Sequence, residues 1–216
     1  MSISIFKNDF FQINGSPDMT LNPNYGVVKL PMSRADLVSV RVELSSGVGV
    51  PQDALVNYGA DNELTRKVSM WRIPMSSKIA DLFHVYAVEL NKVFNYKISA
   101  IQDIQYLEYN VGDFYKTHTD INCEMGSTRK ISISWILDDD FTGGELKIIS
   151  GGEEVVIQNN TEELIAFTSF MNHCVTPVTS GKRKVLVCWI NGESWRWCMN
   201  SYYGCLDFVL VQSYLA

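Results

Sequence analysis

The chain has 216 residues, of which 46% are hydrophobic and 19% charged, with a net charge of -6 and a pI of about 5.1. The hydrophobic content excludes an intrinsically disordered chain, and the length suits one large domain. The acidic balance argues against a nucleic-acid-binding protein, although one or two cations could still hold a small anion.

The cysteines and the apolar runs suggest where the protein resides. Five cysteines without a Cys-x-x-Cys pair or regular spacing indicate neither a disulfide framework nor a structural zinc site. The first residues lack the features of a signal peptide, and no apolar run approaches the roughly 18 residues of a membrane span. We therefore expect a soluble, cytoplasmic protein that binds neither nucleic acid nor membranes.

The first part of the chain predicts two strands and a helix. Strand-like runs cover Ile3–Ile13 and Tyr25–Leu30, and a turn-rich stretch, Asn14–Asn24, separates them. Ser33 is typical of a helix N-cap and precedes a predicted helix over Arg34–Leu44.

A polar loop, Gly47–Lys67, separates this helix from a longer predicted helix over Ser76–Phe94. The apolar residues of the second helix keep a 3.6-residue period. They are Ile79, Leu82, Phe83, Tyr86, Leu90 and Val93. His84 lies within this helix, and we expect it to be structural or exposed.

After Tyr96 the pattern changes to short β-rich runs separated by turn signals. The runs are Ile101–Tyr109, Lys130–Leu137, Glu145–Ile149, Glu154–Gln158, Glu163–Thr168, His173–Val178 and Lys184–Ile190. Strands of this spacing predict a sandwich or barrel, and the preceding helices can cover the outside of a double-sheet jelly roll. The expected fold is mostly β with flanking helices (α+β).

We expect one domain over residues 1–216. Residues 1–98 would supply N-terminal strands and support helices, and residues 99–195 would form the core. Residues 196–216 are an aromatic C-terminal extension.

Two of the three histidines lie in the β-rich half, where they suggest a metal site. His118 and Asp120 are two positions apart, so in an extended segment both point to the same face. His173 follows Asp120 by 53 positions, enough chain to cross a jelly roll and return beside the pair. Two imidazoles and one carboxylate are the ligand set of non-haem Fe(II) oxygenases. Taken alone, each histidine could be an ordinary loop residue.

Arg183 adds a cation to this set. It shares strand parity with Val185, Val187 and Trp189. If that face points inward, the guanidinium is buried at high cost unless it meets an anion, and a dicarboxylate co-substrate would supply one. The alternatives are an ion pair with a protein carboxylate, or an inward orientation of the opposite face.

Five ordered blocks over about ninety residues carry a family resemblance. They are Tyr109–Asp120, Arg129–Leu137, Thr142–Leu146, His173–Arg183 and Trp189. This stretch resembles the catalytic core of the Fe(II)- and 2-oxoglutarate-dependent oxygenases, specifically the prolyl 4-hydroxylase-like (PKHD-type) group. The resemblance implies a double-stranded β-helix core, of the jelly-roll or cupin-like kind, supported by N-terminal helices.

The resemblance also assigns roles to the matching residues. It implies that His118, Asp120 and His173 bind Fe(II), that Arg183 binds the distal carboxylate of 2-oxoglutarate, and that Tyr109 helps to hold this co-substrate. We expect each ligand histidine to use its second ring nitrogen in a hydrogen bond.

Three further residues match positions at the substrate. Tyr115 matches a position near the substrate, and Arg129 and Trp189 match positions that line the substrate cleft. As alternatives, Tyr115 and Trp189 could be core aromatics and Arg129 a surface cation. The collagen-type enzymes carry lysine where this chain has Arg183, which weakens any inference about the substrate.

These implied roles predict a dioxygenase that uses Fe(II), 2-oxoglutarate and O2, with ascorbate as an optional addition, and that releases succinate and CO2. The expected reaction is that of a prolyl 4-hydroxylase on a peptide or protein. The alternative substrates are a free amino acid or another small metabolite. A third hypothesis is a non-catalytic jelly roll that binds a metal or a small acid. The sequence leaves the oligomeric state open.

Overall fold

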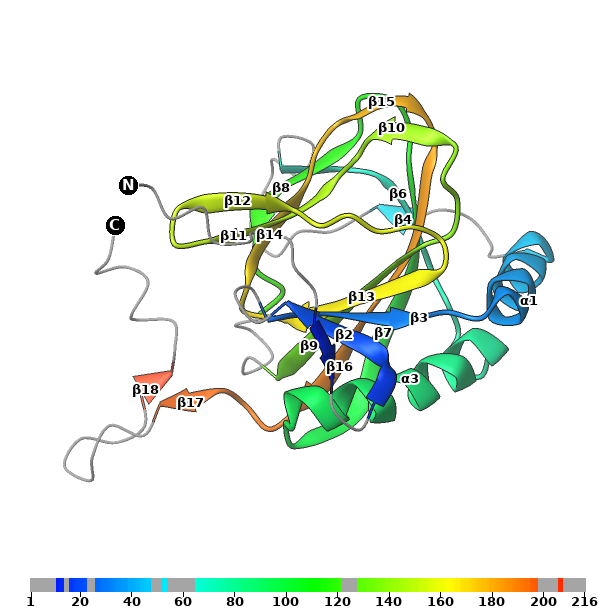
Figure 1. Ribbon diagram of the computed structural model, residues 1–216. Helices are drawn as coiled ribbons and strands as arrows, with labels where there is room; N and C mark the ends of the chain where they lie inside the picture. The colour runs from blue at the N-terminus through cyan, green and yellow to red at the C-terminus, as the bar shows by residue number, and fades with distance from the viewer. Residues whose placement is uncertain are drawn as a thin grey trace.

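The structure is a computed structural model that describes residues 11–13, 16–22, 26–47, 52–53, 65–121, 128–197 and 206–207. Two antiparallel β-sheets face each other, and two helices cover the outer side of the larger sheet (Figure 1). This arrangement confirms the predicted jelly-roll core with flanking helices.

The larger sheet has the strand order β1-β2-β3-β13-β9-β16-β7-β6-β4. Its strands are β1 (Phe11–Ile13), β2 (Ser16–Asn22), β3 (Val27–Pro31), β4 (Gln52–Asp53), β6 (Ser69–Arg72), β7 (Ile98–Tyr109), β9 (Arg129–Ile136), β13 (Glu163–Thr168) and β16 (Arg183–Gly192).

The smaller sheet has the order β12-β11-β14-β8-β5. Its strands are β5 (Arg66–Lys67), β8 (Phe114–His118), β11 (Leu146–Ser150), β12 (Glu153–Val156) and β14 (Asn172–Val175). Two short pairs complete the described strands: β10 (Phe141–Gly143) with β15 (Val178–Gly181), and β17 (Arg196–Trp197) with β18 (Leu206–Asp207). From β7 onwards the chain passes repeatedly between the two sheets, so residues distant in sequence meet between them.

The helix α1 (Arg34–Ser45) begins where the sequence predicts, and α3 (Lys78–Phe94) begins two residues later than the predicted Ser76. Ser33 and Ser77 are the N-caps, and each hydroxyl accepts a hydrogen bond of 3.0 Å from the backbone N–H three residues later. The carboxylate of Glu43, on α1, accepts hydrogen bonds of 3.2 and 3.0 Å from the first two backbone N–H groups of α3. One helix therefore caps the other, which fixes their relative position.

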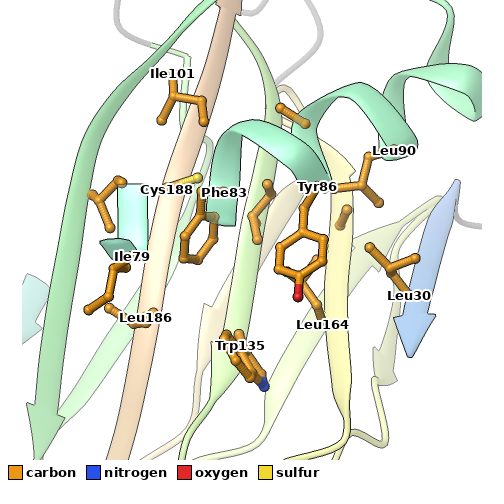
Figure 2. Packing of buried hydrophobic residues seen from close by; sticks show 14 of the residues in the cluster. Leu30, Ile79, Phe83, Tyr86, Leu90, Ile101, Trp135, Leu164, Leu186 and Cys188 are labelled. Carbon is orange, nitrogen blue, oxygen red and sulfur yellow. The ribbon is translucent and has the colours of Figure 1, made fainter. Parts of the chain in front are cut away.

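The main hydrophobic core lies between α3 and the larger sheet. Phe83, Tyr86 and Leu90 project from α3 onto the strands that carry Trp135 and Leu186 (Figure 2). Burying a side chain of this size contributes about 1.5–3 kcal/mol. The indole N–H of Trp135 donates to a backbone carbonyl at 2.9 Å, so its burial leaves no unpaired donor there.

Two smaller clusters fill the space between the sheets. One consists of Val27, Leu146, Ile148, Val155, Ile157, Ile165 and Phe167. The other consists of Met70, Leu107, Tyr109, Ile136, Val175, Val178 and Val185. The two clusters leave the polar side chains described below between them.

Several predicted segments differ from the structure. The predicted loop Gly47–Lys67 contains β4 and β5, and β6, β8 and β10 were not predicted as strands. The stretch predicted as turn-rich, Asn14–Asn24, contains β2, which pairs with β1 and β3. The predicted run His173–Val178 is two strands, β14 and β15, because the chain leaves the smaller sheet at Pro177, which has no N–H to donate to a ladder. Residues 3–10 of the first predicted strand and most of the aromatic extension lie outside the described residues.

His84 is exposed on α3 and contacts the carbonyl of Ala80, consistent with its expected structural role. Within the described part of the chain, no helix combines the length and apolar character needed to cross a membrane.

Candidate metal centre and co-substrate site

Strands β8 and β14 bring two histidines together. His118 and His173 are direct cross-strand partners, and their ring centroids lie 4.1 Å apart. Asp120 follows β8, with Oδ1 3.5 Å from Nε2 of His118 and Oδ2 3.4 Å from Nε2 of His173. One donor atom from each residue lies within 4.8 Å of the others. The spacing of His118 and Asp120 therefore places both on one face, as predicted.

Backbone carbonyls orient both imidazoles. Nδ1 of His118 lies 2.7 Å from the carbonyl oxygen of Lys116, and Nδ1 of His173 lies 2.9 Å from that of Met171. Each Nδ1–H donates to its carbonyl, which leaves the Nε2 lone pair free to bind a metal. These contacts agree with the expectation that each ligand histidine uses its second nitrogen.

Asp120 is held from two sides. The hydroxyl of Ser132, on β9, donates to Oδ2 of Asp120 at 2.6 Å, and the hydroxyl of Ser169 lies 3.0 Å from that of Ser132. The backbone N–H of Asp120 donates to the carbonyl of Ser169 at 2.9 Å. Ser132 was not among the residues predicted at the site, because a serine in a strand carries no distinctive sequence signal.

Local electrostatics favour the protonation states that a metal requires. Burial alone would raise the pKa of Asp120, but His173, His118 and the Ser132 hydroxyl together hold it well below its usual range. Burial lowers the pKa of His173 to about 4, although the charge of Asp120 opposes this shift. At neutral pH the carboxylate is ionised and this imidazole is neutral, as metal ligands must be. A donor set of two imidazoles and one carboxylate fits Fe(II).

Arg183 lies between the sheets. It is 2% exposed, and Tyr109 is its cross-strand partner, with the guanidinium carbon 5.2 Å from the ring centroid. Burial lowers the pKa of Arg183. Among the described residues no carboxylate forms an ion pair with it, so the inward orientation is favoured over the two alternatives.

The Gly-Gly turn of the Thr142–Leu146 block makes room for Arg183. Gly143 and Gly144 have φ values of +70° and +64°. A Cβ on Gly144 would lie 2.9 Å from Cδ of Arg183, and one on Gly143 would lie 2.4 Å from a backbone carbonyl oxygen. Glycine is therefore favoured at both positions, because the backbone has a positive φ and because a Cβ would collide with its neighbours.

The three residues predicted at the substrate are connected to the proposed metal ligands by direct or successive contacts. Tyr115 stacks on His118 with a centroid distance of 3.5 Å, and its burial raises its pKa to about 12. The guanidinium carbon of Arg129 lies 3.9 Å from the ring centroid of Trp189. Nη1 of Arg129 also donates to the backbone carbonyl of Asp120 at 3.4 Å. All three residues therefore lie beside the proposed metal ligands or contact a residue that does.

Arg66 is a second buried arginine, and the sequence analysis gave it no role. It is 8% exposed and lies opposite Tyr115 in the β5–β8 pairing, with its guanidinium carbon 4.7 Å from the Tyr115 ring centroid. Its Nε is buried and has no hydrogen-bond partner in the part of the chain that the structure describes. A polar loop ending in a basic pair offered no sign of this burial.

Comparison with protein families gives a match over residues 104–191 to the 2OG-Fe(II) oxygenase superfamily. A PKHD-type hydroxylase of Synechococcus sp. (strain CC9902) is 28% identical over 55% of this chain and 54% of the relative. A PKHD-type hydroxylase of Colwellia psychrerythraea is 38% identical over 35% of this chain and 30% of the relative. The matches thus span about half, or less, of the length of these curated relatives.

Solved structures share the fold. A Pseudomonas putida prolyl-4-hydroxylase superposes with a TM-score of 0.62 at 20% identity, covering 79% of this chain and 94% of the other. A Trichoplax adhaerens prolyl hydroxylase in complex with a hypoxia inducible factor peptide fragment has a TM-score of 0.58 at 17% identity, covering 77% and 84%. At these identities the likeness establishes the double-stranded β-helix fold.

Proposed function

Because this chain is a 2OG-Fe(II) oxygenase of the PKHD type, we propose that it hydroxylates a prolyl residue in a peptide or protein and converts 2-oxoglutarate to succinate and CO2. The observation that carries this proposal is the placement of His118, Asp120 and His173 around one point, between the sheets that also bury Arg183.

Each residue has a defined task in the proposed reaction. His118, Asp120 and His173 hold Fe(II), which together with 2-oxoglutarate and O2 supplies the oxidising chemistry. The guanidinium of Arg183 pairs with the distal carboxylate of 2-oxoglutarate, and this ion pair offsets the cost of burying the cation. Tyr109 borders the same space and helps to orient the co-substrate.

The prolyl specificity rests on the relatives and on the aromatic lining. The curated relatives are named PKHD-type hydroxylases, and the structural neighbours include prolyl hydroxylases, one of them bound to a peptide. Tyr115, stacked on His118, and Trp189, packed against Arg129, would contribute apolar surface to a site for a ring such as proline. Arg129, packed on Trp189, can donate hydrogen bonds to a peptide carbonyl.

Succinate formation from 2-oxoglutarate with Fe(II) tests the chemistry. The parent should form succinate, and His118→Ala should lose both this turnover and tight metal binding. Equal turnover by His118→Ala would refute the proposed site. Proline-containing peptides should raise turnover and gain the mass of one oxygen atom. If only proline-free small molecules do so, the prolyl assignment is wrong.

A further inference from the structure

The space beside the proposed metal ligands carries positive charge that the described protein groups do not neutralise. Arg66 and Arg129 lie on different sheets, and both act electrostatically on Tyr115, which stacks on His118. In the described part of the chain, neither guanidinium forms an ion pair with a carboxylate.

Two acidic side chains lie close enough to act on Arg129, and both are engaged elsewhere. Asp120 is bound by Ser132 and faces the two histidines. Asp103 forms an ion pair with Arg72 at 3.3 Å and accepts a hydrogen bond from Gln105 at 2.6 Å. The charges of Arg66 and Arg129 also oppose each other. An added anion would relieve this repulsion.

Arg66 shows the clearest need for a ligand. Burial to 8% exposure is costly for a guanidinium, and the Tyr115 ring offers only a cation–π contact at 4.7 Å. Its buried Nε lacks a hydrogen-bond partner among the described residues. A guanidinium presents its donors in a fork that matches a carboxylate. Arg183 is available to 2-oxoglutarate, so this anion would come from the other substrate.

We propose that the substrate to be hydroxylated carries a carboxylate close to the oxidised C–H bond, and that Arg66, together with Arg129, binds it. This inference rests on the proposed 2-oxoglutarate-dependent hydroxylation at this site and specifies the chemistry of the substrate that the site binds. The carboxylate can be that of a free amino acid or chain end, or that of an acidic side chain next to the target residue. Both sources present the same chemistry to Arg66.

The test compares ligand pairs that differ by one negative charge. L-Proline is compared with L-prolinamide for the first source, and acetyl-Pro-Asp-amide with acetyl-Pro-Asn-amide for the second. Binding is measured by isothermal titration to protein loaded with Zn²⁺ and saturating 2-oxoglutarate, so that Arg183 is already occupied and no turnover occurs. In at least one of the two pairs, the affinity for the acid should exceed the affinity for its amide by about tenfold or more. The pair that shows this preference identifies the source.

Variants then assign the preference to Arg66. Arg66→Met should lose most of the acid preference, since only Arg129 then remains to bind the carboxylate, while Arg66→Lys should keep a larger part because it retains the charge without the fork. Lys67→Met, an exposed neighbour on the same strand, should behave like the parent. If Arg66→Met does not fold, Arg66→Gln provides the same comparison with a polar side chain.

The outcomes separate this inference from the proposed function. Equal affinity of the parent for acid and amide in both pairs overturns the carboxylate proposal, and an undiminished acid preference in Arg66→Met overturns the role of Arg66. Succinate formation by the parent is measured separately. It can succeed when the carboxylate preference fails, and its failure leaves the binding comparison intact.

Discussion

Ser132 donates a 2.6 Å hydrogen bond to Oδ2 of Asp120, from a strand that follows the proposed metal-ligand segment in the chain. Ser134 lies two residues further along the same face of β9, is also buried, and makes no hydrogen bond to Asp120 in the described structure. The two serines therefore form a matched pair for testing whether a hydrogen bond behind the carboxylate supports metal binding.

Ser132→Ala should weaken metal binding. Without the hydroxyl, Asp120 accepts one hydrogen bond fewer and its carboxylate can rotate, so the affinity for the metal should fall by about tenfold. Titration with Mn²⁺, followed by electron paramagnetic resonance, measures the change. Ser134→Ala should keep the parent affinity, and equal losses in both variants would indicate a general packing effect instead.

Arg183→Met should keep the stability of the fold but lose the binding of 2-oxoglutarate. Arg183 is buried and pairs with no carboxylate among the described residues, so an apolar side chain should leave the free energy of unfolding without ligand unchanged or raise it by about 1–4 kcal/mol. Saturating 2-oxoglutarate with Mn²⁺ should raise the melting temperature of the parent by about 5–10 °C, and that of Arg183→Met hardly at all.

Lys184→Met is the control for this experiment. Lys184 is the next residue on β16 and pairs with Asp138 at 3.0 Å, away from the buried guanidinium. It should retain the full response to 2-oxoglutarate. A full response in Arg183→Met would mean that the co-substrate binds elsewhere.

Gly144→Ala should disturb Arg183 directly. The new methyl group would meet Cδ of Arg183 at 2.9 Å in a backbone conformation with φ +64°, so unfolding should become easier by about 3 kcal/mol. Gly151 has a similar φ of +60°, but a Cβ added there would meet no heavy atom within 4 Å. Gly151→Ala should therefore lose only about 1–2 kcal/mol, the cost of the backbone conformation. Urea denaturation measures both. Equal losses would show that the contact with Arg183 has no energetic effect.

Glu108→Gln should change how stability depends on pH. Burial opposes ionisation of Glu108, but its contacts with Lys182 at 2.7 Å and Tyr106 at 2.7 Å lower its pKa below the ordinary value of 4.5. Because the folded-state pKa is the lower one, the stabilisation is present above pH 4.5 and is lost as the pH falls through the folded value.

The variant should therefore be less stable than the parent by about 0.5–1 kcal/mol at pH 7 and equal to it in acid. Urea denaturation at several pH values gives the comparison. Glu89→Gln removes an exposed pair with Lys92 and should show a smaller difference at every pH. A constant deficit for Glu108→Gln down to low pH would exclude the ionic contribution.

Much of the fold could be predicted because its signals are local. Ser33 predicts a helix start through its own hydroxyl, and the apolar period of α3 predicts the face that packs on the larger sheet. The errors arose where tertiary pairing overrides local chemistry. β2 forms in a segment rich in turn residues because β1 and β3 both pair with it.

The sequence by itself determined the chemistry of the proposed metal ligands. It supplied two imidazoles, a carboxylate at strand spacing from one of them, and Arg183 on a definite strand parity, because residue type and the period of two are properties of the chain alone.

Only the tertiary structure decided which groups complete the site. It made His118 and His173 cross-strand partners, placed Ser132 behind Asp120, and buried Arg66 against Tyr115. The reason is physical: these contacts join different strands of the two sheets. The orientation of a serine or arginine side chain at such a junction depends on the packing of the sheets, which local sequence patterns do not encode.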